Sequence, residues 1–228
     1  MIGSETLVLS GGGFKSQVAA AALGAAARPA MLFVHDGRPG EARSRAAFDA
    51  ICDHLQARRR DHVAMANLFS GHNAPGDFER HAPSDGTVAI TPLAGLQLLC
   101  AAAAHALRVN AQRLVWAVRA GDDFDKLSQI TEAVVMVEHL AAQNPAPAPA
   151  PAGAQADVAA GVGLRVETPL LEMTGPEIIE VGQQLGVPWN LSRDCWLDGE
   201  APCGACPGCR ERHDAFAAAA LQPEPARP

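Results

Sequence analysis

Four cysteines near the end of this 228-residue chain restrict the fold of its C-terminal segment more than any other feature. Their spacing is Cys195-x7-Cys203-x2-Cys206-x2-Cys209. Short Cys-x2-Cys steps let a tight turn direct two sulfurs at one metal ion, and zinc prefers four ligands in a tetrahedron. Because four sulfurs leave no ligand position for water, the spacing predicts a structural zinc site. A redox or disulfide cluster and an iron–sulfur cluster are the alternatives, since thiolates also suit iron.

Composition and charge restrict the partners of the chain. The net charge is -7, aromatic residues make up 4% and tyrosine is absent, which argues against a nucleic-acid-binding face. No apolar run reaches ~18 residues, so no membrane span is expected. The N-terminus lacks the pattern of a secretory signal, so we expect a cytoplasmic protein. A small molecule or another protein is the expected partner.

Short apolar runs alternate with helical patterns along the chain. Alternation of this kind predicts an α/β fold, a Rossmann-like parallel sheet covered on both faces, with its ligand site at the carboxyl ends of the strands. The expected strands cover residues 6–9, 31–34, 63–69, 114–118 and 164–167. The expected helices cover residues 16–27, 47–55, 96–107, 126–141 and 174–185.

Composition also divides the chain into three parts. We expect a nucleotide-binding α/β domain over residues 1–143 and a strand, a helix and the zinc-binding segment over residues 158–228. Between them, residues 144–157 are almost wholly Pro and Ala, which cannot form a packed core and indicate a linker or loop. In the C-terminal part, Thr174 and Glu177 have the spacing of a helix capping box.

A glycine-rich loop, Ser10-Gly11-Gly12-Gly13-Phe14-Lys15-Ser16, follows the first expected strand. Backbone N–H groups in such a loop can bind phosphates, and the start of the next helix adds the positive end of its dipole. The spacing is neither Walker A nor Gly-x-Gly-x-x-Gly, and a turn without a ligand is the alternative. The residues predicted to contact a nucleotide here are Ser10, Gly11, Gly12, Gly13 and Ser16.

The loop and the cysteines together resemble one family, the 7-cyano-7-deazaguanine synthases, which are N-type ATP pyrophosphatases with the loop Ser-Gly-Gly-x-Asp-Ser. The similarity is closest over residues 168–216, which include Thr168-Pro169-Leu170 and the cysteine segment, and looser over residues 5–140. The resemblance implies an adenine-nucleotide α-hydrolase-like fold with a small zinc-bearing C-terminal segment. It implies ATP, Mg²⁺ and 7-carboxy-7-deazaguanine as ligands, and a homodimer or another protein partner.

The positions that the family uses for ATP and substrate are altered. Lys15 stands where the family has Asp, so the local charge is reversed. Lys15 either binds a phosphate as a point charge or pairs with a carboxylate such as Asp122 or Asp123. Asp125 matches an aspartate on the family's substrate side, and a helix N-cap is its alternative role. Lys15 and Asp125 are therefore the catalytic candidates.

A second altered segment, His35-Asp36-Gly37-Arg38, follows the second expected strand, where such folds often contact the base. His35, Asp36 and Arg38 are predicted to contact the nucleotide, with stabilisation of the loop as the alternative. Three cationic positions of the family are apolar or glycine here, and each charged hydrogen bond lost costs ~1.5–3 kcal/mol. Two functions are compatible with this pattern. One is an ATP-dependent ligase that makes 7-cyano-7-deazaguanine or activates a related carboxylate, and the other is a catalytically degenerate binding or regulatory subunit.

Several other residues carry structural predictions. Cys52 and Cys100 lie on apolar helix faces and are predicted to be buried in the core. The run Arg58-Arg59-Arg60 is predicted to be a solvated helix end. Trp189 and Trp196 flank the first cysteine of the cluster and are predicted to pack against it.

Overall fold

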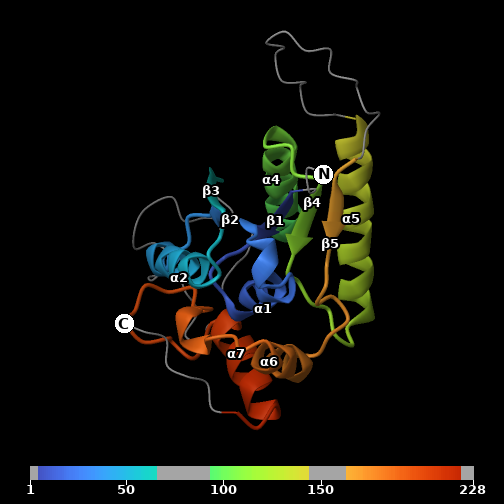
Figure 1. The fold of residues 1–228 in the computed structure, drawn as a ribbon. Helices are drawn as coiled ribbons and strands as arrows, with labels where there is room; N and C mark the ends of the chain where they lie inside the picture. Colours follow the sequence, from blue (N-terminus) through green and yellow to red (C-terminus); the bar gives the residue numbers. More distant parts are fainter. Residues whose placement is uncertain (1–4, 66–92, 144–162, 222–228) are drawn as a thin grey trace.

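The fold is built on one parallel sheet. A computed structural model describes residues 5–65, 93–143 and 163–221 of the chain. In these residues five strands pair in the order β3-β2-β1-β4-β5, all in parallel (Figure 1). The strands are β1 (Thr6–Leu9), β2 (Ala30–His35), β3 (Arg59–Ala64), β4 (Arg113–Trp116) and β5 (Arg165–Glu167). The predicted α/β class with a Rossmann-like parallel sheet is confirmed.

Helices cover both faces of the sheet. They are α1 (Phe14–Ala22), α2 (Glu41–His54), α4 (Ala94–Arg108), α5 (Phe124–Gln143), α6 (Gly175–Gln184) and α7 (Pro207–Ala218), with short 3-10 turns η1 (Ala25–Ala27) and η2 (Trp189–Leu191). Side chains of β1 alternate between the two faces, as a strand requires. Val8 packs in the cluster that contains residues of α1, α2, α6 and α7, whereas Leu7 and Leu9 pack with residues of α4 and α5.

The third strand differs from the prediction. It covers Arg59–Ala64, and the expected residues 66–69 lie outside the described part of the chain. Arg59 and Arg60 open this strand, and α2 already ends at His54, so the predicted arginine helix end is wrong. Because β3 is an edge strand with partly exposed side chains, it carries no apolar run that the sequence pattern could reveal.

Predictions from the sequence for other helices were partly correct. The helix expected over 16–27 begins at Phe14 and ends at Ala22, because Gly24 has a φ of 83° and starts the turn η1. The predicted capping box of α6 is confirmed, since Glu177 accepts a hydrogen bond from the Thr174 backbone N–H at 2.7 Å. Cys52 is buried as predicted, but Cys100 is exposed, so its predicted place in the core is wrong.

The C-terminal segment returns to the start of the chain. β5 is a strand of the same sheet, α6 packs against α1, and α7 packs against α6 (Figure 1). This arrangement brings the beginning of α7 close to the loop between β1 and α1. The Pro/Ala stretch predicted to be a linker lies outside the described residues, and within those residues no helix is long and apolar enough to cross a membrane.

Candidate functional site

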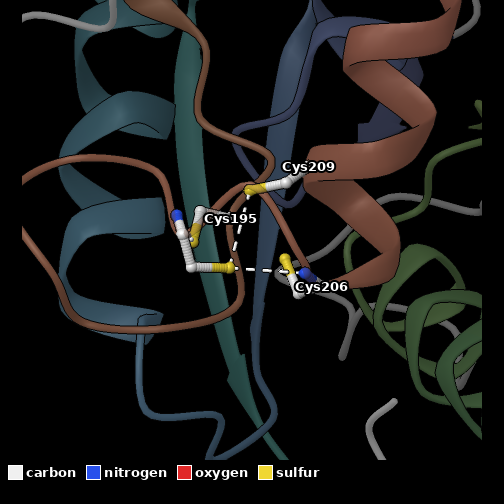
Figure 2. A group of neighbouring side chains, drawn as sticks. Cys195, Cys206 and Cys209 are labelled. Carbon is white, nitrogen blue, oxygen red and sulfur yellow. Dashed lines mark hydrogen bonds between the residues drawn. The ribbon is translucent and has the colours of Figure 1, made fainter. Parts of the chain in front are cut away.

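The four cysteines of the C-terminal segment lie together, as the sequence predicts. Their sulfur atoms all lie within 4.8 Å of one another, and the Sγ atoms of Cys203 and Cys209 are 3.9 Å apart. Four thiolates that bind one zinc ion at ~2.3 Å are about 3.8 Å from each other. Figure 2 shows Cys195, Cys206 and Cys209 pointing at a common centre. The cluster can therefore hold one metal ion.

Local backbone structure positions these sulfurs. Gly204 takes a φ of 74° between two of the cysteines, and Pro207 opens α7, which puts Cys209 in its first turn. The backbone N–H of Cys203 donates to Cys195 Sγ at 3.4 Å, and that of Cys206 donates to Cys203 Sγ at 3.3 Å. Hydrogen bonds from the Cys206 and Cys209 thiols lower the pKa of Cys195, which favours the thiolate that a metal needs.

The two tryptophans that were predicted to pack against the cysteine cluster have different neighbours. Trp196 packs against the cysteine cluster, as predicted. Trp189 instead belongs to the main core, where its ring lies edge-on to Phe216 with centroids 5.2 Å apart. Its distance in sequence from Cys195 gave no indication of this, because η2 turns the chain between them.

Residues directly before the cysteine cluster bind the glycine loop. The backbone N–H of Arg193 donates to the Gly12 carbonyl at 2.8 Å, and the N–H of Phe14 donates to Asp194 Oδ1 at 3.1 Å. The Arg193 guanidinium also donates to carbonyls in the turn between Cys195 and Cys203. The metal centre and the glycine loop are therefore held as one unit.

Within the glycine loop, the two serines that were predicted to contact a nucleotide are hydrogen-bonded to each other. Ser10 and Ser16 are buried, and their hydroxyl oxygens are 2.8 Å apart. The Gly12 N–H donates to Ser10 Oγ at 3.2 Å, and Gly12 has a φ of 78° with the Ser44 carbonyl packed against it. These contacts fix the loop. Gly11, Gly13 and Ser16 border a cavity, whereas the Ser10 hydroxyl faces inward.

The cavity has a volume of about 280 Å³ and lies at the carboxyl ends of β1 and β4, between the loop and α7. This is the position expected for the ligand site of a parallel α/β sheet. Charged side chains of both signs line it, namely Lys15, Arg38, Arg193, Asp194 and Glu211. Apolar and backbone groups complete its wall, among them Leu9, Leu98, Trp116, Ala117, Trp196, Pro207 and Gly208.

Lys15 is paired within the protein, but not with the predicted carboxylates. Its Nζ lies 2.7 Å from Glu211 Oε2, and Arg119 Nε donates to the other oxygen of Glu211 at 2.9 Å. Burial opposes ionisation of Glu211, but Lys15 and Arg119 outweigh it and hold the pKa of Glu211 below its usual range. The expected pairing with Asp122 or Asp123 is wrong, because both are exposed at the start of α5.

Asp125 is exposed in the first turn of α5 and does not line the cavity. Its alternative role as the N-cap is wrong, since Asp123 precedes the helix and accepts the Lys126 backbone N–H at 2.9 Å. The sequence contains two acidic residues at this helix start, and only the backbone geometry distinguishes the cap from its neighbour. A substrate contact by Asp125 stays a prediction.

The residues after β2 separate into different roles. Asp36 is buried and forms an ion pair with Arg38, whose guanidinium lies over the Trp196 ring at 5.8 Å and lines the cavity. His35 does not line the cavity; its Nδ1 is 2.8 Å from Glu41 Oε1, and its Nε2 is 3.2 Å from His62 Nδ1. Of these three predicted contacts, the structure brings Arg38 to the site, and Asp36 orients Arg38.

Sequence reasoning missed the acidic residues of the site. Asp194 is almost buried, and Arg212 of α7 binds its Oδ2 at 3.0 Å. Burial raises the pKa of Asp194, and the charge of Arg212 opposes that shift. The position of Asp194 directly before Cys195 was the only available signal, because its partners lie far away in the sequence.

These observations define an α/β protein with a ligand cavity at the carboxyl ends of a parallel sheet and a metal-binding C-terminal segment. The sequence model of the family described as "Queuosine biosynthesis protein QueC" matches residues 5–220. The chain belongs to this family.

Curated relatives carry the name 7-cyano-7-deazaguanine synthase. The Nostoc sp. (strain PCC 7120 / SAG 25.82 / UTEX 2576) protein is 44% identical over 62 residues, 27% of each chain. The Caldicellulosiruptor bescii protein is 28% identical over 130 residues, 56% of this chain and 51% of the relative. The alignments thus span between about a quarter and a half of these relatives.

Two solved structures show weaker similarity. The U34-tRNA thiolase NcsA from Methanococcus maripaludis, determined with its [4Fe-4S] cluster, has a TM-score of 0.48 at 12% identity, covering 93% of this chain and 64% of that chain. The NMN synthetase from Francisella tularensis has a TM-score of 0.45 at 12% identity, covering 96% of this chain and 78% of that chain.

Proposed function

We propose that this protein is an ATP-dependent ligase that activates the carboxylate of a 7-deazaguanine. The favoured reaction forms 7-cyano-7-deazaguanine, the product that the name of its relatives states. Its substrate would be 7-carboxy-7-deazaguanine, the acid that the family resemblance implies. One observation carries the proposal: the glycine loop and three cationic side chains, Lys15, Arg38 and Arg193, border a single cavity at the carboxyl ends of the strands.

The chemistry explains why such a site needs cations. A carboxylate has a poor leaving group until it is joined to AMP, and this step releases pyrophosphate from ATP. Lys15 and Arg38 would attract the phosphates, and the flat Trp196 indole beside Arg38 offers a surface for a heterocyclic base. Carboxylate oxygens are the ligands that Mg²⁺ prefers, and Asp194 and Glu211 are the carboxylates that line the cavity.

We propose that the metal of the cysteine cluster is one zinc ion with a structural role. The close approach of the four sulfurs suits a single ion better than a cluster of several irons, which would hold them further apart. Elemental analysis of the purified protein tests this. About one zinc per chain supports it, and iron in place of zinc overturns it.

One assay tests the proposed reaction. The protein is incubated with ATP, Mg²⁺, ammonia and 7-carboxy-7-deazaguanine, and AMP and the nitrile are measured. We expect AMP release that depends on the deazaguanine and that falls at least about 100-fold in Lys15→Met. If AMP stays at background and calorimetry detects no ATP binding, the ligase proposal is rejected.

A second function, a degenerate binding or regulatory subunit, is proposed as the alternative because of two contacts in the site. Asp194 already occupies the first N–H group of α1, and Glu211 already pairs with Lys15. In that case the protein would bind a 7-deazaguanine in the cavity without releasing AMP. Calorimetry with 7-carboxy-7-deazaguanine alone, set beside the AMP assay, separates the two functions.

Location and assembly complete the proposal. We place the protein in the cytoplasm, where cysteines more often bind metals than form disulfides. A homodimer is proposed from the family resemblance alone. Analytical ultracentrifugation tests it, since a species of twice the 23.7 kDa chain mass is expected.

A further inference from the structure

Glu211 lies among positive charges at the wall of the cavity. Its two carboxylate oxygens accept from Lys15 at 2.7 Å and from Arg119 at 2.9 Å. Lys15 and Arg119 thus share one carboxylate, so two positive charges meet a single negative charge in this hydrogen-bonded group.

The other anion of the site cannot be exchanged in the same way. Asp194 accepts the Phe14 N–H at the start of α1, binds Arg212, and its side chain is only 10% exposed. A Cβ atom added at Gly13 would collide with its Oδ1, so no free space remains there. Asp194 therefore already occupies the Phe14 N–H at the start of α1, where such loops normally bind anions.

Glu211 differs because solvent reaches it. The side chains of Glu211, Lys15 and Arg119 are 24%, 25% and 26% exposed. Because solvent reaches all three side chains, the Glu211 carboxylate can turn into water when an incoming anion with more charge takes its place. Rotation of one glutamate side chain away from Lys15 is sufficient.

We propose that Lys15 and Arg119 form an anion-binding site at the edge of the cavity, and that Glu211 is a built-in competitor which the ligand displaces. The site takes a phosphate or carboxylate group. This inference rests on the proposed function only for the source of that anion, which is the nucleotide or the deazaguanine acid. It moves anion binding from the glycine-loop backbone to side chains of α1 and the segment after β4.

The test compares wild type with Glu211→Gln, which keeps the shape of the side chain and removes its charge. Inorganic pyrophosphate is titrated by calorimetry, and 7-carboxy-7-deazaguanine forms a second arm that distinguishes a phosphate from a carboxylate ligand. We expect Glu211→Gln to bind at least one of them about 10-fold more tightly. Adding Lys15→Met to this variant is expected to abolish the gain. Asp198→Asn, an exposed carboxylate of the same segment, serves as the matched control and is expected to change nothing.

A second measurement uses the wild-type protein, so its result does not depend on whether a variant folds. The chain has only two lysines, Lys15 in the proposed site and Lys126 near the start of α5. Pyrophosphate is expected to slow acetylation of Lys15, measured by peptide mass spectrometry. The inference is overturned if Glu211→Gln binds neither anion more tightly, or if its gain survives Lys15→Met. Neither experiment needs ATP turnover, so a failed AMP assay and a failed anion site are distinguishable.

Discussion

Asp194 and Phe14 are 180 positions apart in the sequence, yet the Phe14 backbone N–H donates to Asp194 Oδ1 at 3.1 Å. Phe14 is the first residue of α1, and Asp194 directly precedes the first cysteine of the metal centre. Together with the hydrogen bond from the Arg193 N–H to the Gly12 carbonyl, this contact joins the glycine loop to the C-terminal segment. It satisfies one of the four N–H groups that a helix start leaves without a partner, and its carboxylate is favourable at the positive end of the helix dipole.

Removing this carboxylate is expected to destabilise the protein strongly. In Asp194→Ala, Arg212 loses its ion-pair partner in a largely buried place, and Phe14 loses its acceptor. Breaking a buried pair from one side costs ~3–5 kcal/mol. We expect a loss of about 3 kcal/mol in the free energy of unfolding, measured with urea. Asp198→Ala, an exposed aspartate of the same segment, is the control and is expected to change it by less than ~0.5 kcal/mol.

Metal removal is expected to disturb the glycine loop as well as the cysteine segment. Arg193 and Asp194 bind the loop and directly precede Cys195, so their positions depend on the metal-bound turn. A chelator, or Cys206→Ser, should increase hydrogen exchange at the amides of Gly12 and Phe14. Cys100→Ser provides the control because Cys100 is exposed and lies outside the cluster. Unchanged exchange at the loop after complete metal loss would contradict the coupling.

The sequence identified the parts of the site that follow from local chemistry. The cysteine spacing, the glycine loop and the apolar strands each act over a few residues, so the cluster and most of the sheet were predictable. Glu211 and Asp194 were not, because their roles depend on α7 and the segment before Cys195 folding back onto α1. The edge strand β3 was misplaced for a related reason, since its two arginines were interpreted as part of a solvated helix end.

Two adjacent glycines of the loop are expected to differ sharply on substitution by alanine. Gly12 has a φ of 78°, and an added Cβ would collide with the Ser44 carbonyl of α2. Gly11 has no atom within 4 Å of the added Cβ and needs no left-handed conformation. We expect Gly12→Ala to lower the free energy of unfolding by at least ~2 kcal/mol, and Gly11→Ala to change it by under ~1 kcal/mol. Equal losses in thermal denaturation would show that the turn at Gly12 is wrongly described.

The remaining cysteines are expected to react with alkylating agents at very different rates. Burial raises the pKa of the Cys52 thiol to about 12, so at pH 8 only about one thiol in 10,000 is the reactive thiolate. The Cys100 residue is exposed, although partial burial of its thiol raises the pKa of that thiol too. Because a raised pKa keeps the thiol protonated until the pH approaches it, labelling of Cys52 should increase about tenfold per pH unit between pH 8 and 10.

The measurement is iodoacetamide labelling of the metal-loaded protein, followed by peptide mass spectrometry. At pH 8 we expect Cys100 to be labelled first, while the cluster cysteines are protected by their metal and Cys52 by burial. Cys100→Ser should then leave almost no labelling until urea unfolds the chain and exposes Cys52. Equal labelling of Cys52 and Cys100 in the folded protein at pH 8 would mean that the packing of α2 against the sheet opens on the timescale of the reaction.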